Sequence, residues 1–190
     1  MQWSTISVTV SLLVGLSIAR TLTGLVAMFR SRRDARLYWP AFVWAGVILL
    51  TLLNAWAALN DVPKAQARFS FFEYLLLGLM IMTLYTASAL LLPAEKLEPG
   101  DSLKKHFDDE GRLALVLYAA FGVLSALVEL VIFERPLHWA RLINEAVLFA
   151  LPVATFAAPT ERLRKTLTLV FFVLYLLELT TSALIFLPGS

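Results

Sequence analysis

The stretch FSFFEYLLLGLMIMTLYTASALLL, residues 69–92, decides the fold class of this chain, and Glu73 is its single charged residue. It is long enough for a helix to cross the roughly 30 Å hydrocarbon core of a membrane. Its polarity does not alternate from residue to residue, as a strand of a membrane β-barrel would require. The stretch therefore predicts a transmembrane α-helix.

Further apolar runs of this kind occur along the 190 residues of the chain. The predicted spans are Ile6–Phe29, Tyr38–Leu59, Phe69–Leu92, Leu113–Phe133, Trp139–Ala158 and Leu167–Leu187. We therefore predict an all-α membrane protein, a six-helix bundle that forms one transmembrane domain over residues 1–190. The longest connection, Pro93–Arg112, is predicted to be a solvated loop with a short interfacial helix at SLKKHF.

The composition excludes several classes of protein. Hydrophobic residues make up 59% of the chain and charged residues 16%, against about a quarter charged in soluble domains. This balance excludes a soluble enzyme and a nucleic-acid-binding domain. The chain has no cysteine, two histidines and no recognisable nucleotide-binding or hydrolase motif. We therefore expect no catalytic activity, no metal and no cofactor.

The basic residues of the loops predict the orientation of the chain. Eleven basic residues fall on one side of the six-span arrangement and four on the other. The richer side holds Arg30, Arg32, Arg33, Arg36, Lys96, Lys104, Lys105, Arg112, Arg162, Arg164 and Lys165. This side is predicted to be cytoplasmic, with both termini on the opposite side of a bacterial inner membrane. The first span is expected to be a retained anchor, because no basic segment precedes it.

A weak internal similarity suggests a repeat. Residues 38–59 align with 138–159, matching Trp39 to Trp139, and TASALLLP aligns with TTSALIFLP. Each half has three spans, so the halves would run in opposite directions through the membrane, as in many transporters. Apolar segments also match by chance, so a 3+3 inverted repeat and chance similarity both remain open.

Polar residues inside the spans are the candidates for a functional site, because they are costly at that depth. Arg20 in the first span requires a partner, and Glu178 in the sixth span lies at a similar predicted depth. Two interpretations are open. In one, Arg20 and Glu178 form a buried ion pair that fixes the helix register; in the other, Arg20 forms a gate or an anion site.

Further polar side chains are predicted in the outer half of the bundle. They are Asn54, Glu73, Glu129, Glu145 and Glu178. Their excess of acids predicts a vestibule that accepts protons or cations, provided that the helix faces converge. Two alternatives are that Glu145 contacts Arg141 within its own helix and that Glu73 faces the lipid headgroups.

The fifth predicted span carries small residues at every fourth position. Ala146, Ala150, Ala154 and Ala158 form a ladder that would allow another helix to approach closely. The same span contains Pro152, which leaves one backbone carbonyl without its usual donor. We expect a packing seam there, open to a second copy of the chain or another membrane protein; an ion-coordinating break or a hinge is the alternative.

Several motifs resemble a family of small, uncharacterised bacterial integral membrane proteins. The similar segments are GLSIARTLTGL, RSRRDARLYW with PAFVW, NAWAAL, FFEYLLLGLMIMTLYTASALLLP and LKKHF. They cover roughly the first two-thirds of the chain. The resemblance implies a helical bundle in the bacterial inner membrane and no particular activity.

Two functional classes follow from these features. The first is a structural, sensory or accessory membrane module in which the intramembrane polar residues stabilise packing. The alternative is a channel or transporter for protons or a small cation that uses Glu129, Glu145 and Glu178, with Arg20 as the counter-charge.

Overall fold

The computed structural model describes residues 3–31, 37–58, 69–95, 97, 101–133 and 139–185. The described residues form helices and no β-strand. The helices are α1 (Trp3–Ser31), α2 (Trp39–Ala58), α4 (Phe71–Leu91), α5 (Leu103–His106), η1 (Phe107–Gly111), α6 (Arg112–Val131), α7 (Trp139–Ala157) and α8 (Glu161–Ile185). The prediction of an all-α protein is therefore confirmed for the part of the chain that the structure describes.

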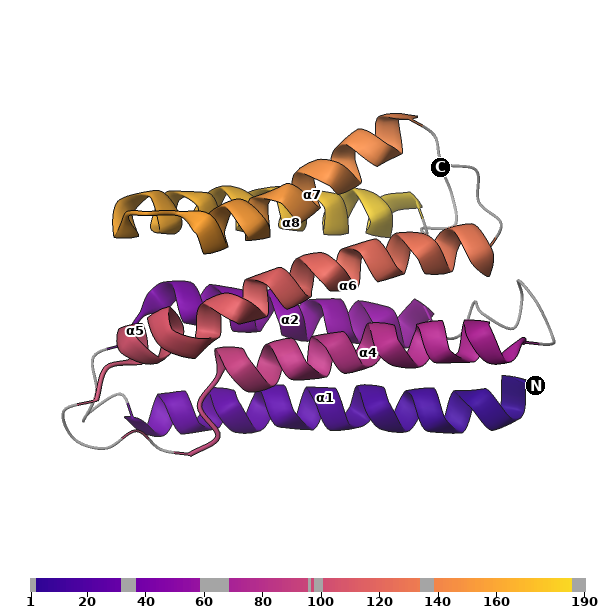
Figure 1. The fold of residues 1–190 in the computed structure, drawn as a ribbon, viewed down its shortest axis with the longest axis horizontal. Helices are drawn as coiled ribbons and strands as arrows, with labels where there is room; N and C mark the ends of the chain where they lie inside the picture. Colours follow the sequence, from indigo (N-terminus) through magenta and orange to yellow (C-terminus); the bar gives the residue numbers. More distant parts are fainter. Residues whose placement is uncertain are drawn as a thin grey trace.

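The long helices lie side by side with their axes roughly along one direction (Figure 1). α1 forms one edge of the bundle and α7 and α8 form the opposite edge. Between these edges, α4 packs against α1 and α6, and α2 contacts α1, α4 and α8. Since α5, η1 and the start of α8 lie at the same end of the bundle, we call this end, with Lys104, Asp108, Arg112, Glu161, Arg164 and Lys165, the charged end.

Among the described residues, four helical segments are long and apolar enough to cross a membrane. They are Ile6–Ser31, Trp39–Ala58, Phe71–Leu91 and Leu103–Val131. Large apolar side chains such as Val8, Leu12 and Leu79 face outward and are more than half exposed. A surface of this kind is compatible with lipid and supports a membrane-embedded protein. α7 contains a shorter apolar segment, Glu145–Ala157.

Aromatic rings from three helices form the centre of the larger apolar core. The indole of Trp44 on α2 stacks on Phe171 of α8, with ring centroids 4.6 Å apart. Tyr118 of α6 meets Phe171 edge to face at 5.8 Å. Such offset and edge-to-face pairs add to the gain from burial. These contacts bring α2, α6 and α8 together in the core.

In the region Pro93–Arg112, predicted as a loop with a short helix at SLKKHF, the structure has that helix as α5, but the helix continues beyond its predicted end. The helix that carries the fourth span begins at Leu103 instead of Leu113, passes through the π-helical turn η1 and continues to Val131. Leu103 and Phe107 are both fully buried. Because they lie four residues apart, they share a helix face that packs on the apolar core, and this burial extends the helix into a sequence rich in charge.

The predicted inverted repeat is not confirmed. In the first half, α1 packs along α4, but the corresponding pair in the second half, α6 and α8, has no comparable contact along its length. α6 and α8 are instead joined through aromatic side chains such as Tyr118 and Phe171.

Candidate functional site

Arg20 binds the C-terminal end of a neighbouring helix. Its Nη2 donates hydrogen bonds to the carbonyl oxygens of Ala89, at 3.0 Å, and Leu92, at 2.7 Å. The predicted ion pair with Glu178 is therefore wrong: Arg20 lies on α1 at one edge of the bundle, and Glu178 lies on α8 at the other (Figure 1).

The end of α4 explains why a cation is placed here. The last carbonyls of a helix lack intrahelical donors, and Pro93, which follows, has no N–H to offer them. The helix dipole also places partial negative charge at this end. In an apolar region these carbonyls must be satisfied within the protein. Arg20 supplies both hydrogen-bond donors and positive charge, so it acts as a cap for α4.

The contact between α1 and α4 requires a glycine one turn after Arg20. A Cβ at Gly24 would lie 2.5 Å from the Cβ of Leu92, far closer than two carbon atoms can approach. The other polar residues on this face are satisfied within α1. Ser17 donates to the carbonyl of Leu13 and Thr21 to that of Ser17, both at less than 3 Å. The hydroxyls of this face and the Nη2 of Arg20 are therefore occupied by structural contacts, whereas the buried Nη1 of Arg20 has no hydrogen-bond partner in the described part of the chain.

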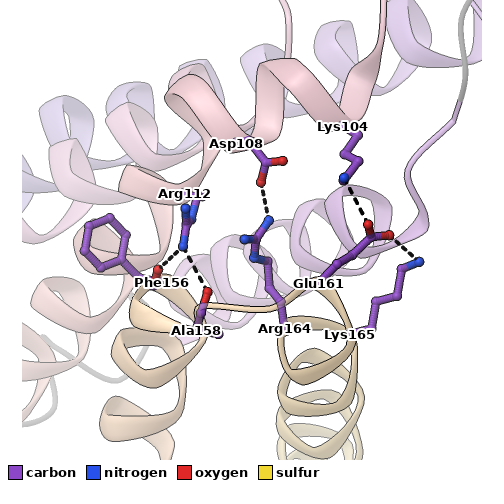
Figure 2. Close-up of polar contacts among 8 residues, drawn as sticks. All are labelled: Lys104, Asp108, Arg112, Phe156, Ala158, Glu161, Arg164 and Lys165. Carbon is purple, nitrogen blue, oxygen red and sulfur yellow. Dashed lines mark hydrogen bonds and ion pairs between the residues drawn. The ribbon is translucent and has the colours of Figure 1, made fainter.

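Arg112 makes the same kind of contact at the charged end. Its Nη2 donates to the carbonyl oxygens of Phe156, at 2.6 Å, and Ala158, at 3.2 Å, where α7 ends before Pro159 (Figure 2). The guanidinium also lies 5.8 Å from the centre of the Phe156 ring. Sequence analysis did not single out this role, because the acceptors are backbone atoms.

Ion pairs join the start of α8 to α5 and η1, which lie above it in Figure 2. Arg164, which is buried, pairs with Asp108 of η1. Glu161 accepts from Lys104 at 2.9 Å and from Lys165 at 2.5 Å. Hydrogen bonds from Lys165 and Lys104 lower the pKa of Glu161 to about 2. Because Asp108 lies beyond the predicted helix SLKKHF, the helical extension through η1 is what brings this carboxylate to α8.

A hydroxyl network links three helices within the apolar core. The Thr51 Oγ1 donates to the carbonyl of Val47 at 2.9 Å and lies 3.0 Å from the hydroxyls of both Tyr118 and Tyr175. The Thr51 hydroxyl has one hydrogen, and it is donated to the Val47 carbonyl. The hydroxyls of the two tyrosines therefore act as the donors to Thr51. Nearby, the Trp44 indole donates to Thr168 at 3.1 Å. Sequence analysis did not identify Thr51 as the centre of this network.

Three of the four predicted acids of the outer half lie on three adjacent helices. Glu129 on α6, Glu145 on α7 and Glu178 on α8 are half-buried, and each interacts with another group. Counted from the ends of α6, α7 and α8 at the charged end, they lie about 18 to 26 Å along their helices at 1.5 Å per residue. Glu178 is close enough to Tyr118 and Tyr175 to interact with them electrostatically. Their depths are therefore similar.

Similar depth does not bring the polar residues together in one ion site. Among the described residues, no three acidic, histidine or cysteine side chains are placed to hold a metal ion. Asn54 is exposed on α2. Glu73 forms a capping box with Ser70 at the start of α4, where its carboxylate accepts from the Ser70 N–H at 2.6 Å. Glu73 thus has a local structural role, as capping boxes do.

The alanine ladder of α7 faces away from the other described helices. Ala146, Ala150 and Ala154 are exposed, and Ala158, just after the helix, is buried. The opposite face of α7 packs on α6, where the Phe149 ring lies directly over Gly122 and leaves no room for a Cβ there. Within this chain, Gly122 therefore allows the close helix contact, and a role of the ladder in binding a second protein stays a prediction.

The chain matches no family model, no curated protein and no solved structure. The predicted resemblance to small bacterial membrane proteins therefore stays a prediction. The class that the structure supports is a helical membrane protein, with four helices in the described part of the chain that are long and apolar enough to cross a membrane.

Proposed function

We propose that this chain is a six-span module of the bacterial inner membrane with a structural or accessory role and no catalytic activity. One observation carries the proposal: Arg20, the charged residue in the middle of an apolar helix, caps the end of α4. In a substrate site or a gate, the Arg20 guanidinium would have to release its hydrogen bonds in order to bind the substrate or to move. Here both of its bonds go to backbone carbonyls of a packed neighbour.

The hydroxyl network supports the same role. Thr51, Tyr118 and Tyr175 satisfy one another at the meeting point of α2, α6 and α8. Hydrogen bonds of this kind between membrane helices contribute about 0.6 kcal/mol each on average. They hold the helices in a fixed arrangement, as a module that presents its loops or faces to another protein requires.

The proposed orientation places the charged end in the cytoplasm. Lys104, Arg112, Arg164 and Lys165 lie together at this end (Figure 2), and basic residues favour the cytoplasmic side of a membrane. Reporter fusions at Pro99 and Pro159 should then report the cytoplasm, and a fusion at Ser190 the opposite side. A cytoplasmic signal at Ser190 would contradict the six-span arrangement.

The second candidate function is a pathway for protons or a small cation. It is favoured by the similar depth of Glu129, Glu145 and Glu178 on adjacent helices and by the proximity of Glu178 to the buried tyrosines. Carboxylates at membrane depth commonly mark such pathways.

Flux measurements separate the two functions. In vesicles under a pH, sodium or potassium gradient, an accessory module should leave the membrane as tight as empty vesicles. A pathway predicts flux that falls in Glu129→Gln and Glu178→Gln but persists in Glu110→Gln, a matched change at an exposed position. Flux with this pattern in folded variants would replace the accessory role with transport.

A further inference from the structure

A hollow opens at the charged end beside the start of α8. It has a volume of about 510 Å³ and is lined by Thr160, Glu161, Arg162 and Lys165. None of the contacts described above between α1 and α4 or between α6 and α7 uses this surface.

The hollow carries an excess of positive charge. Glu161 is its acidic residue, and both of its carboxylate oxygens are already bound by Lys104 and Lys165. Arg162 is exposed, and its guanidinium makes no ion pair with any residue in the described part of the chain. The lining holds Arg162 and Lys165 against the one carboxylate of Glu161, and Lys104 beside it adds a further positive charge. This balance favours an anion, and Arg162 is available to bind it.

The surface next to the hollow is apolar. Leu169 and Val173 follow Arg162 by seven and eleven residues, so the three side chains share one face of α8. Leu169 is 55% exposed and Val173 is 49% exposed. A charged group at one end of an apolar strip matches a phospholipid, with its phosphate in the hollow and an acyl chain along α8. A free anion would use the hollow alone.

We propose that the hollow binds the phosphate of an anionic phospholipid in the cytoplasmic leaflet. This inference rests on the proposed membrane orientation. Basic pockets on the cytoplasmic side of membrane helices are suited to anionic headgroups. A zwitterionic lipid with a headgroup ammonium would need a free carboxylate, but Glu161 is occupied by the two lysines. The site therefore prefers phosphatidylglycerol to phosphatidylethanolamine.

The test compares lipids and variants by binding to the full chain purified in detergent. Phosphatidylglycerol should bind more tightly than phosphatidylethanolamine or phosphatidylcholine and should raise the midpoint of thermal unfolding. Arg162→Gln should weaken phosphatidylglycerol binding about fivefold, which corresponds to about 1 kcal/mol for one basic residue near the membrane surface. Lys105→Gln removes a charge at an exposed position outside the hollow and should leave binding unchanged.

Three outcomes would overturn the proposal. An equal loss of phosphatidylglycerol binding in the Arg162 and Lys105 variants would indicate that the lipid is attracted by the overall charge of this end. Equal binding of the three lipids would remove the headgroup preference. Stabilisation by inorganic phosphate alone, equal to that by lipid, would assign the hollow to a soluble anion. Because these measurements are made in detergent, the reporter fusions test the orientation independently of them.

Discussion

Two helix pairs, α1 with α4 and α6 with α7, use the same contact at different depths. In each pair an arginine binds the last carbonyls of the neighbouring helix just before a proline, and a glycine allows close packing. Arg20 lies about 16 Å along α1 from Ser31, inside the apolar span. Arg112 lies at the charged end.

The surroundings decide how much each contact contributes. Water at the charged end can replace a lost donor, whereas a carbonyl left unpaired in an apolar region remains unsatisfied. The two arginines form similar hydrogen bonds, but Arg20, which lies deeper in the apolar region, should contribute more to the free energy of unfolding. The four predictions below test this difference, from the largest expected effect to the smallest.

Replacing Arg20 should have the largest effect. Arg20→Ala leaves the carbonyls of Ala89 and Leu92 without their donor, so the free energy of unfolding should fall by about 2 to 4 kcal/mol, since hydrogen bonds to charged groups contribute about 1.5 to 3 each. Arg20→Lys keeps the charge and should lose less. Denaturation in mixed micelles would measure both. An unchanged stability in Arg20→Ala would show that the cap contributes nothing.

Adding a methyl group between the paired helices should have the next largest effect. Gly122→Ala places a Cβ inside the Phe149 ring, and Gly24→Ala places one against Leu92. Each should lower the free energy of unfolding by about 1 to 3 kcal/mol, as overpacking does. Gly78→Ala is the matched control, because its Cβ would meet open space. Equal stability of all three variants would contradict the close helix contacts.

Replacing Arg112 should have a smaller effect than replacing Arg20. Arg112→Ala removes the bonds to Phe156 and Ala158, but water at the charged end can reach these carbonyls. The expected loss of stability is about 1 kcal/mol, the usual net value of a hydrogen bond. The same denaturation measurement applies. A loss equal to or larger than that of Arg20→Ala would reverse the proposed order of the two contacts.

Acid should have the smallest effect, confined to the charged end. The pKa of Glu161 is lowered from 4.5 to about 2 in the folded protein. Its ion pairs therefore stabilise the fold fully above pH 4.5, and this contribution is lost as the pH falls toward 2. The difference between the midpoints of thermal unfolding of the wild type and of Glu161→Gln should shrink as the pH falls over this range. A constant difference would show that Glu161 does not titrate there.

The sequence determined the membrane class of the protein because uninterrupted apolar length is a one-dimensional property. The runs around residues 6–29, 38–59 and 69–92 correspond to α1, α2 and α4, whose length and composition suit a membrane. The gathering of Lys104, Arg112 and Lys165 at one end also agrees with the sequence, since it follows from where the apolar runs stop.

The tertiary structure alone decided which groups the polar side chains contact. Arg20 binds carbonyls of α4, and every residue has a carbonyl, so no side-chain pattern could point to Ala89 or Leu92 in place of Glu178. Thr51 became the centre of a network because packing turned Tyr118 and Tyr175 toward it. The relative rotation of helices results from close packing between residues far apart in the sequence, and apolar periodicity in these spans leaves that rotation undetermined.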